Sequence, residues 1–478
     1  TGFNNVNNEK IIYYFNNASG EGSHTEGIAT TAFDKASHAE GYHTYASGFG
    51  AHAEGTYTTK FDSNYDIIYL NNVASGKGSH AEGCATTASG NYSHAEGQYT
   101  CASGDHSHAE GRGDEWGISI TIASGDGSHA EGDHTTASGN HSHAEGGQTY
   151  ASGYYSHAEG SISIASGSVS HAEGQYTCAS GGCSHAEGRN TCASGEASHA
   201  EGRGSIAFGI GSHAEGIKTT ASGLNEFSVP HTEGYCTYAS GRGHAEGYQT
   251  CAYGGHSEGY CTYASSVDSH AEGECTTAIA GSHAEGDRSK ASGLASHAEG
   301  KSLATNKYCH AEGYLTQAAG EYSHAEGYNT YTSGIGAHAE GCNTTVSGQY
   351  SHAEGLQTCA SGDYSHTEGY CTYASDRGHA EGEGTNASGV DSHAEGWSSK
   401  ASGIGSHAEG CYTTASGQYS HAEGRYITAS GDYSHAEGYN TNASGEASHA
   451  EGWYTTASNF ASHASGNYNA AMITGGSY

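Results

Sequence analysis

The chain has little of what fills an ordinary protein core. Its 478 residues include one proline, one methionine and three tryptophans, and hydrophobic residues of all kinds make up 34%. Large aliphatic side chains are too scarce to pack two or three conventional globular domains at normal density. Two possibilities remain: disorder, or an architecture whose interior is thin enough for small residues to fill.

Basic residues are also few. Lys and Arg number 16 against 52 Asp and Glu, and the formal net charge at pH 7 is −36 with histidine neutral. This acidity argues against nucleic acid as a partner, because binding to phosphates depends on lysine and arginine. The sequence also lacks an apolar run long enough to span a membrane. Low hydrophobicity and high net charge would favour disorder unless another feature orders the chain.

That feature is a tandem repeat. The tetrapeptide His-x-Glu-Gly occurs thirty times between His24 and His449, and a degenerate copy, His-Ala-Ser-Gly, begins at His463. Long stretches keep a spacing of 14 residues without interruption, as between His379 and His463. A fixed period of this length indicates an architecture with one structural unit per period.

Each repeat contains two short strands and their turns. In Ser-His-Ala-Glu-Gly, a period of two places Ser, Ala and Gly on one face and His and Glu on the other. In Thr-x-Ala-Ser-Gly, the Thr, Ala and Gly share a face. We therefore predict an all-β fold, a β-solenoid of 14-residue coils with an interior of Ala, Gly, Ser and Thr, closed at its turns by glycine. The near-absence of proline agrees, because proline would remove hydrogen bonds between coils.

The repeat spacing also predicts how the chain is divided. We expect a continuous solenoid of about 31 coils over residues 18–466, preceded by a cap or junction segment (1–17) and followed by a C-terminal tail (467–478). Because residue 1 is threonine, we also expect a processed or partial product. Interruptions of the period predict insertions near residues 56–73, 112–122 and 224–230.

The repeat resembles a known family. Units such as Ala-Ser-Gly-Asp-Tyr-Ser-His-Ala-Glu-Gly-Tyr-Asn-Thr-Asn (429–442) resemble the head repeats of YadA-type trimeric autotransporter adhesins and related repeats in phage and viral fibres. The resemblance covers residues 18 to about 466. It implies a left-handed parallel β-roll, a parallel homotrimer, and a location outside the cell or on a cell or virion surface. This chain has His and Glu where that family commonly has aliphatic residues on the trimer-facing strand.

The His-x-Glu pair hardly varies between repeats, whereas the turn residues vary freely. A shared subunit interface explains this constancy, so we predict His–Glu layers along a threefold axis. Closely spaced carboxylates are expected to raise the pKa of the histidines, so that the oligomer loosens as pH rises past their titration. The representative interface residues are His80, Glu82, His94, Glu96, His157, Glu159, His324, Glu326, His407, Glu409, His435 and Glu437.

Other chemistry is possible for this pair of residues. His and a carboxylate two residues apart on a strand can chelate zinc or another divalent ion. The thirty copies of the pair, however, are equivalent. The Gly and Ala residues beside them supply no nucleophile and no side chains that would orient metal ligands. We therefore assign no catalytic residue, no metal site and no cofactor.

The fourteen cysteines occupy several registers of the repeat. Cys178 and Cys192 share a register one coil apart, as do Cys261 and Cys275. Neighbouring positions in a sheet lie about 4.8 Å apart, within disulfide range. These two pairs are candidate disulfides, and the alternative is that cysteine replaces threonine as a small half-buried residue.

Tyrosine is abundant, with 36 copies against eight phenylalanines. Many copies fall at turns, where stacked coils would align them into an exposed aromatic ridge. They either cover the edges of the solenoid by stacking on one another or contact glycans, other fibres or a host surface. The representative ridge residues are Tyr92, Tyr155, Tyr322, Tyr350, Tyr419 and Tyr433.

These features together predict a structural or adhesive extracellular fibre protein that is not an enzyme. We expect a rigid rod that associates with itself as a homotrimer and contacts glycans or a host surface, with no nucleic-acid partner and no membrane span. One alternative is a filament or coat protein whose rods join end to end. A third is an ice-binding solenoid, which is less favoured because the constant threonine points inward.

Overall fold

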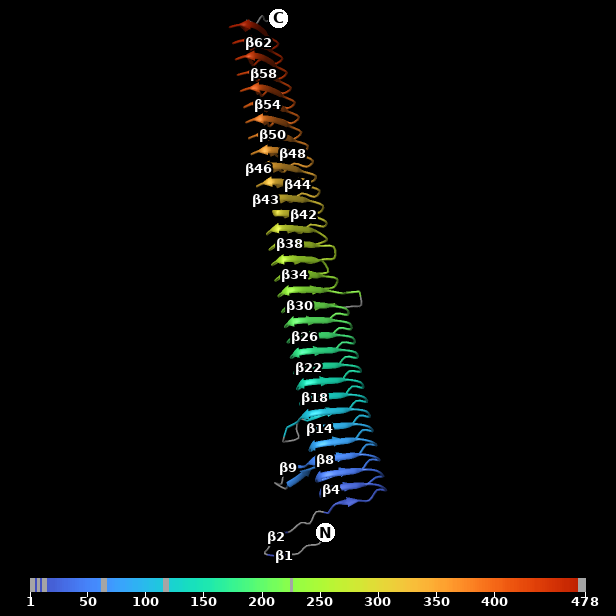
Figure 1. The fold of residues 1–478 in the computed structure, drawn as a ribbon. Coiled ribbons are helices and arrows are strands. Elements are labelled where there is room, and N and C mark those ends of the chain that lie inside the picture. The colour runs from blue at the N-terminus through green and yellow to red at the C-terminus, as the bar shows by residue number, and fades with distance from the viewer. Residues whose placement is uncertain are drawn as a thin grey trace. The chain divides into compact units, whose positions relative to one another are not determined.

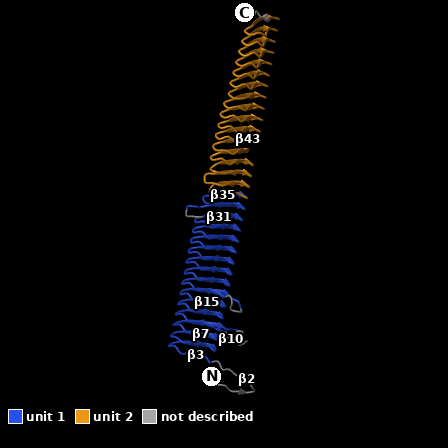
Figure 2. Cartoon of the chain, turned by 180° about the vertical axis from the view of Figure 1, so that it is seen from behind, with its two compact units in different colours: residues 1–248 blue, residues 249–478 orange. Residues whose placement is uncertain are grey.

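The computed structural model describes residues 5–6, 9–10, 15–61, 67–114, 120–223 and 227–471. All regular secondary structure in these residues is β-strand, and almost all of it is parallel (Figure 1). The chain divides into two compact units, Thr1–Tyr248 and Gln249–Tyr478 (Figure 2). Each unit is a stack of coils about 14 residues long, which confirms the predicted all-β solenoid.

Each coil contains one long and one short strand. The described residues hold thirty-one long strands. Each begins at the histidine of a repeat, and all but two end at the residue after its glycine, as in β14 (His94–Gln98). Two long strands, β42 (His297–Ala304) and β43 (His310–Ala318), continue through the second half of the coil. The short strand elsewhere has two or three residues, as in β15 (Thr100–Ala102).

Successive coils are in register. Strand β12 (His80–Cys84) lies parallel to β14, with His80 opposite His94. The register is kept across an insertion, since His108 lies opposite His129 although they are 21 residues apart in sequence. A parallel, in-register sheet places each residue on its counterpart in the next coil, so every repeat position becomes a row along the unit.

Small side chains fill the interior, as predicted. Ala95 and Ala102 are completely buried, and Ser93 and Thr100 are 1% and 2% exposed. The buried serine is held by its own turn, because Ser93 Oγ donates a hydrogen bond to the carbonyl oxygen of Gly90 at 2.7 Å. The equivalent bond recurs along the chain, for example from Ser156 to Gly153. The thin interior therefore needs no large aliphatic residues.

The constant glycines are required by the close approach of coils. A Cβ on Gly97 would lie 2.1 Å from the carbonyl oxygen of Gly111 in the next coil, and the φ of Gly97 is 107°. A Cβ on Gly90 would lie 1.9 Å from the carbonyl oxygen of Gly104. No side chain fits at either position without displacing backbone.

The turns are closed mainly by residues other than glycine, which corrects the expectation from sequence. Tyr92 and Tyr99 flank β14, and both are left-handed with φ of 56°. Their amides donate to the preceding coil, Tyr92 to the carbonyl of Lys77 at 2.7 Å and Tyr99 to that of Cys84 at 3.0 Å. These hydrogen bonds offset the cost of a left-handed conformation, and the side chain of Tyr92 projects into solvent.

Insertions form local structure beside the coils. Strands β9 (Thr58–Phe61) and β10 (Ile67–Leu70) pair antiparallel within the segment predicted at 56–73, and β1 (Asn5–Val6) pairs antiparallel with β2 (Glu9–Lys10). None of the described residues belongs to a helix that could cross a membrane. Parts of the predicted terminal and inserted segments lie outside the described residues, namely 1–4, 7–8, 11–14, 62–66, 115–119, 224–226 and 472–478.

Candidate functional site: a ladder of histidine and glutamate

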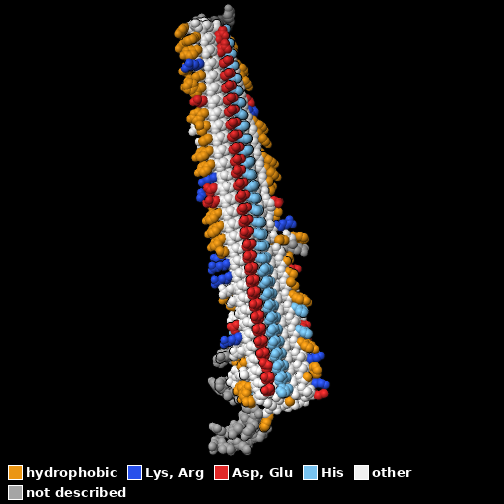
Figure 3. Space-filling view, viewed as in Figure 1, with side chains coloured by type: hydrophobic (Ala, Val, Ile, Leu, Met, Phe, Trp, Pro, Cys, Tyr) orange, Lys and Arg blue, Asp and Glu red, His pale blue; other side chains and the backbone are white. Residues whose placement is uncertain are grey.

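The outward side chains of the long strands form the most regular surface of each unit. In β14 the histidine and the glutamate point away from the buried Ala95 between them. The glutamates of each unit form one row and the histidines a second row beside it (Figure 3). We call this surface the His–Glu ladder, meaning the His and Glu side chains of the motifs from β4 (His24–Ile28) to β62 (His449–Trp453).

Imidazole rings of successive coils stack on one another. The ring centroids of His393 and His407 are 4.6 Å apart, and most neighbouring pairs are 4.7 to 4.9 Å apart, as in His80 with His94 at 4.8 Å. The stacking is not uniform, because the rings of His185 and His199 are tilted by 57°. This contact lies within one chain and was not predicted from the sequence.

Most ladder histidines also lie within 4.0 Å of the glutamate of their own coil. The distance between His Nε2 and Glu Oε2 ranges from 3.4 Å for His213 and Glu215 to 4.0 Å for His352 and Glu354. These pairs are partly exposed, and such surface ion pairs contribute little to stability. Four of the predicted pairs make this contact: His94–Glu96, His324–Glu326, His407–Glu409 and His435–Glu437.

The two remaining predicted pairs stand in the same rows. His80 and Glu82 lie opposite their counterparts in the adjacent coils, as do His157 and Glu159. The six predicted interface residues of the first unit therefore belong to the ladder of that unit, and the six of the second unit belong to the ladder of the second. That a partner chain covers this surface stays a prediction.

The expected direction of the histidine pKa shift was wrong. Thirteen ladder histidines, among them His80, His108 and His324, have a pKa below the ordinary value of 6.5. Partial burial in the stack is the largest cause, and the charge of neighbouring histidines is the next. The glutamates raise the pKa by less. In-register stacking thus places like charges nearest to each other, and these thirteen histidines are mostly neutral at pH 7.

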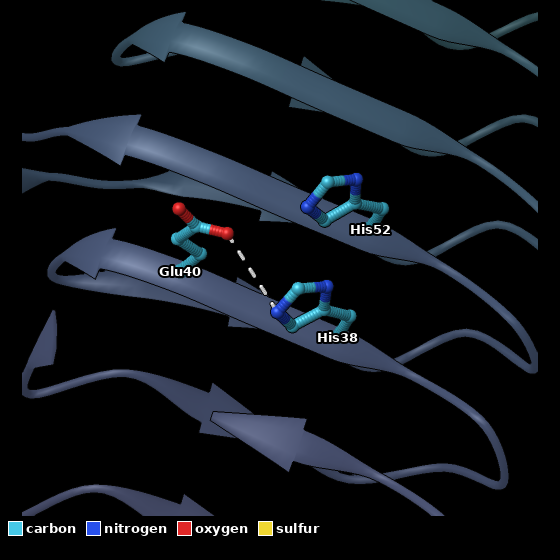
Figure 4. A group of neighbouring side chains, drawn as sticks. All are labelled: His38, Glu40 and His52. Atoms are coloured by element: carbon cyan, nitrogen blue, oxygen red, sulfur yellow. Dashed lines mark ion pairs between the residues drawn. The ribbon is translucent and has the colours of Figure 1, made fainter. Parts of the chain in front are cut away.

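Neighbouring coils bring metal-ligating atoms together. His38 and Glu40 of one coil and His52 of the next offer three ligand atoms that all lie within 4.8 Å of one another (Figure 4). Nine groups of three or more such residues occur in the described part of the chain. The sequence did not predict a metal site, because a single His-x-Glu-Gly motif offers only one histidine and one glutamate.

The structure brings the cysteines of each predicted pair together as free thiols. Cys178 lies opposite Cys192 in parallel strands β25 (Cys178–Ala179) and β27 (Cys192–Ala193). A hydrogen bond between the two thiols lowers the pKa of Cys178 to about 6 and raises that of Cys192. Partial burial, and then the neighbouring Cys261 thiol, raise the pKa of Cys275. The disulfides themselves stay predictions.

The predicted ridge tyrosines are all exposed by more than half, and all six have left-handed backbone. Their rings form short stacks, such as Tyr350 on Tyr364 at 5.7 Å and Tyr419 on Tyr433 at 5.5 Å. Tyr92 stacks instead on His106, a turn histidine outside the ladder. The six predicted ridge tyrosines thus lie in short, separate stacks, some of which include a histidine.

The fold and the ladder define a class, the parallel β-solenoid repeat protein whose coils carry a titratable His–Glu pair. Neither a scan of protein-family models nor a search of curated protein sequences finds a match for this chain.

Proposed function

We propose that the chain is a structural or adhesive fibre protein, not an enzyme, located outside the cell or on a cell or virion surface. In this proposal the solenoid units form a rigid shaft, and three chains associate in parallel through the His–Glu ladder. The observation that carries the proposal is the repetition of one surface on every coil. A surface of this kind suits a long assembly, whereas an active site needs a single distinctive cluster.

The interior supports a mechanical role. Each coil donates backbone hydrogen bonds to the next, as from His94 to the carbonyl of Ser107 at 2.9 Å. The alanine rows are completely buried along each unit. Stability in such a protein comes from neighbouring coils, so the chain can be long without a large core.

The ladder supports self-association. In the pairs from His52–Glu54 to His449–Glu451, the histidine side chains are 33–40% exposed and the glutamates 36–52%. A partner that matches rungs 4.7 to 4.8 Å apart over many coils must have the same spacing. A second copy of this chain satisfies that condition, and the resemblance to YadA-type head repeats points to a parallel trimer.

Hydrogen bonding can offset the repulsion between glutamate rows. A neutral imidazole carries one N–H donor, and an ionised carboxylate accepts at both oxygens. A histidine of one chain can therefore donate to a glutamate of its neighbour. The exposed tyrosine pairs lie on turns away from the ladder, where they would contact glycans or a host surface.

Light scattering of the purified chain tests the proposal. The monomer mass is 48.9 kDa, so three chains would give three times 48.9, about 147 kDa. A mass of 48.9 kDa at micromolar concentration would contradict the trimer. Masses above 147 kDa that rise with concentration would favour the end-to-end filament instead.

Charge reversal tests the ladder as the interface. Five ladder glutamates are changed to arginine, and we expect the mass of this variant to fall toward 48.9 kDa on dilution. A matched variant carries the same five changes at glutamates outside the ladder, and it should remain trimeric. If both variants remain trimeric, another face forms the interface. The ladder variant is Glu312→Arg, Glu326→Arg, Glu340→Arg, Glu354→Arg and Glu368→Arg. The control variant is Glu196→Arg, Glu274→Arg, Glu321→Arg, Glu383→Arg and Glu446→Arg.

A further inference from the structure

Groups of one glutamate and two histidines recur at the start of the first unit. The run from His38 to His129 contains five of them in succession, and each shares a histidine with the next. Within them, His Nε2 lies 3.7 Å from Glu Oε2 at His38 and 3.5 Å at His52. Two imidazole nitrogens and one carboxylate form a ligand set found in zinc enzymes and favoured by other first-row transition metals.

A second observation concerns the histidine nitrogens. The Nε2 atoms of His38, His52, His80, His94 and His108 are each shielded from solvent, and none has a hydrogen-bond partner among the described residues. A shielded polar atom without a partner is costly unless something else bonds to it. Each of these nitrogens belongs to one of the groups just described.

We propose that the His–Glu ladder binds divalent transition-metal ions such as zinc, each ion held by the histidine and glutamate of one coil and the histidine of the next. The unpartnered Nε2 atoms supply the nitrogen ligands, and Glu Oε2 supplies the oxygen. Three protein ligands leave a fourth tetrahedral position for water or for a carboxylate of another chain.

The ladder can reach metal geometry with small side-chain movements. Ligand atoms around a tetrahedral zinc ion are about 3.3 Å apart, given bond lengths near 2.0–2.2 Å. In four of the five groups of the run, the His–Glu distance is 3.5 to 3.9 Å, close to this value. Stacked rings are farther apart, 4.7 Å between the centroids of His38 and His52, and must tilt toward the ion. The ladder accommodates such tilts, as the 57° between His185 and His199 shows.

Sharing of histidines limits how many ions bind. A neutral imidazole offers one lone pair at Nε2, so one histidine cannot serve the groups on both sides of it. Thirty motifs at two histidines per ion allow no more than about fifteen ions per chain. Occupied groups should therefore alternate with empty ones along the ladder.

This inference goes beyond the proposed function and does not depend on the trimer, because all three ligands come from one chain. Failure of the trimer would show in the mass of the protein. Failure of the metal site would show in the amount of metal bound.

Equilibrium dialysis of the full chain against Zn²⁺ at pH 7.5, followed by elemental analysis, tests the proposal. A glutamine variant of the run changes its five glutamates to glutamine, which removes one ligand from each group. Six histidines of the run can hold three ions, so we expect bound zinc to fall by about three per chain. The substitutions are Glu40→Gln, Glu54→Gln, Glu82→Gln, Glu96→Gln and Glu110→Gln.

The control changes Glu196, Glu274, Glu321, Glu383 and Glu446 to glutamine, with the same change of net charge. It should bind as much zinc as the unmodified chain, and comparison with it cancels zinc held by cysteines. Circular dichroism verifies that both variants keep their strands. As a second readout, Co²⁺ added to the unmodified chain should give the visible absorption of a low-coordinate site and saturate. The proposal would be overturned if both variants lost equal amounts of zinc, or if the glutamine variant of the run bound as much zinc as the unmodified chain. Co²⁺ binding without saturation would also overturn it.

Discussion

The imidazole rings of His379 and His393 stack with centroids 4.7 Å apart and planes parallel. The two residues are fourteen positions apart in sequence, and the parallel register places one on the other. Each ring therefore lies mainly against the histidine rings of the adjacent coils. Charge, proton binding and metal binding on this face become properties of a row of side chains.

Acidification should destabilise the fold. The unfolded chain binds protons at histidine with a pKa near 6.5, whereas the folded ladder binds them at lower pH. Between these values the unfolded state carries more protons, so stability is full above about pH 6.5 and is lost as pH falls through the folded pKa. Melting followed by circular dichroism should give a lower midpoint at pH 5.5 than at pH 7.5. An equal or higher midpoint at pH 5.5 would contradict the stacked ladder.

Alanine at one constant glycine should disrupt the solenoid. At Gly97 the new Cβ would meet the carbonyl of Gly111, and the φ of 107° disfavours any side chain. We expect Gly97→Ala to cost at least about 2 kcal/mol of unfolding free energy. Gly147→Ala is the matched control, because a Cβ there would meet nothing within 4 Å. Similar denaturation midpoints for the two variants would show that coils tolerate wider spacing.

The buried serine should contribute through one hydrogen bond. Ser156 Oγ donates to the carbonyl of Gly153 at 2.8 Å, and Ser156→Ala should cost about 1 kcal/mol. The cavity effect is small, because Ala51 and Ala337 occupy this position in other coils and are buried there. The exposed Ser152 of the same coil provides the control, and Ser152→Ala should leave the urea midpoint unchanged. A larger loss at Ser152 would contradict the hydrogen-bond account.

Cys178 and Cys192 should form a disulfide under mild oxidation. The lowered pKa of Cys178 makes it a thiolate at neutral pH, and its partner lies directly opposite. Peptide mapping after treatment with diamide should recover a linked peptide that contains both residues. Cys251 lies opposite Tyr263 and should remain free to alkylate. Recovery of both Cys178 and Cys192 as alkylated thiols would contradict the prediction.

Periodicity was enough to predict the coil, the buried Ala, Ser and Thr, and the outward His and Glu. It could not predict the turn conformation at Tyr92 and Tyr99, because the amides of these residues are held by carbonyls in the preceding coil. The direction of the histidine pKa shift was missed for a related reason. The shift depends on how much of each ring is buried by its neighbours, and the repeat spacing alone does not reveal this burial.

Constancy of the ladder also has two physical sources that sequence cannot separate. Stacking within the chain, as between His80 and His94, would preserve the motif, and so would contact between chains. Distinguishing them requires knowing which face a partner touches.

Photo-cross-linking answers that question most directly. The residue p-benzoylphenylalanine is introduced at Glu326 on the ladder and, in a second protein, at Tyr331, an exposed residue of the short strand β45 (Tyr331–Thr332). After irradiation at micromolar concentration, the Glu326 protein should yield covalent dimers and trimers on a denaturing gel, whereas the Tyr331 protein should remain a monomer. Cross-links from Tyr331 and none from Glu326, or none from either, would contradict assembly through the ladder.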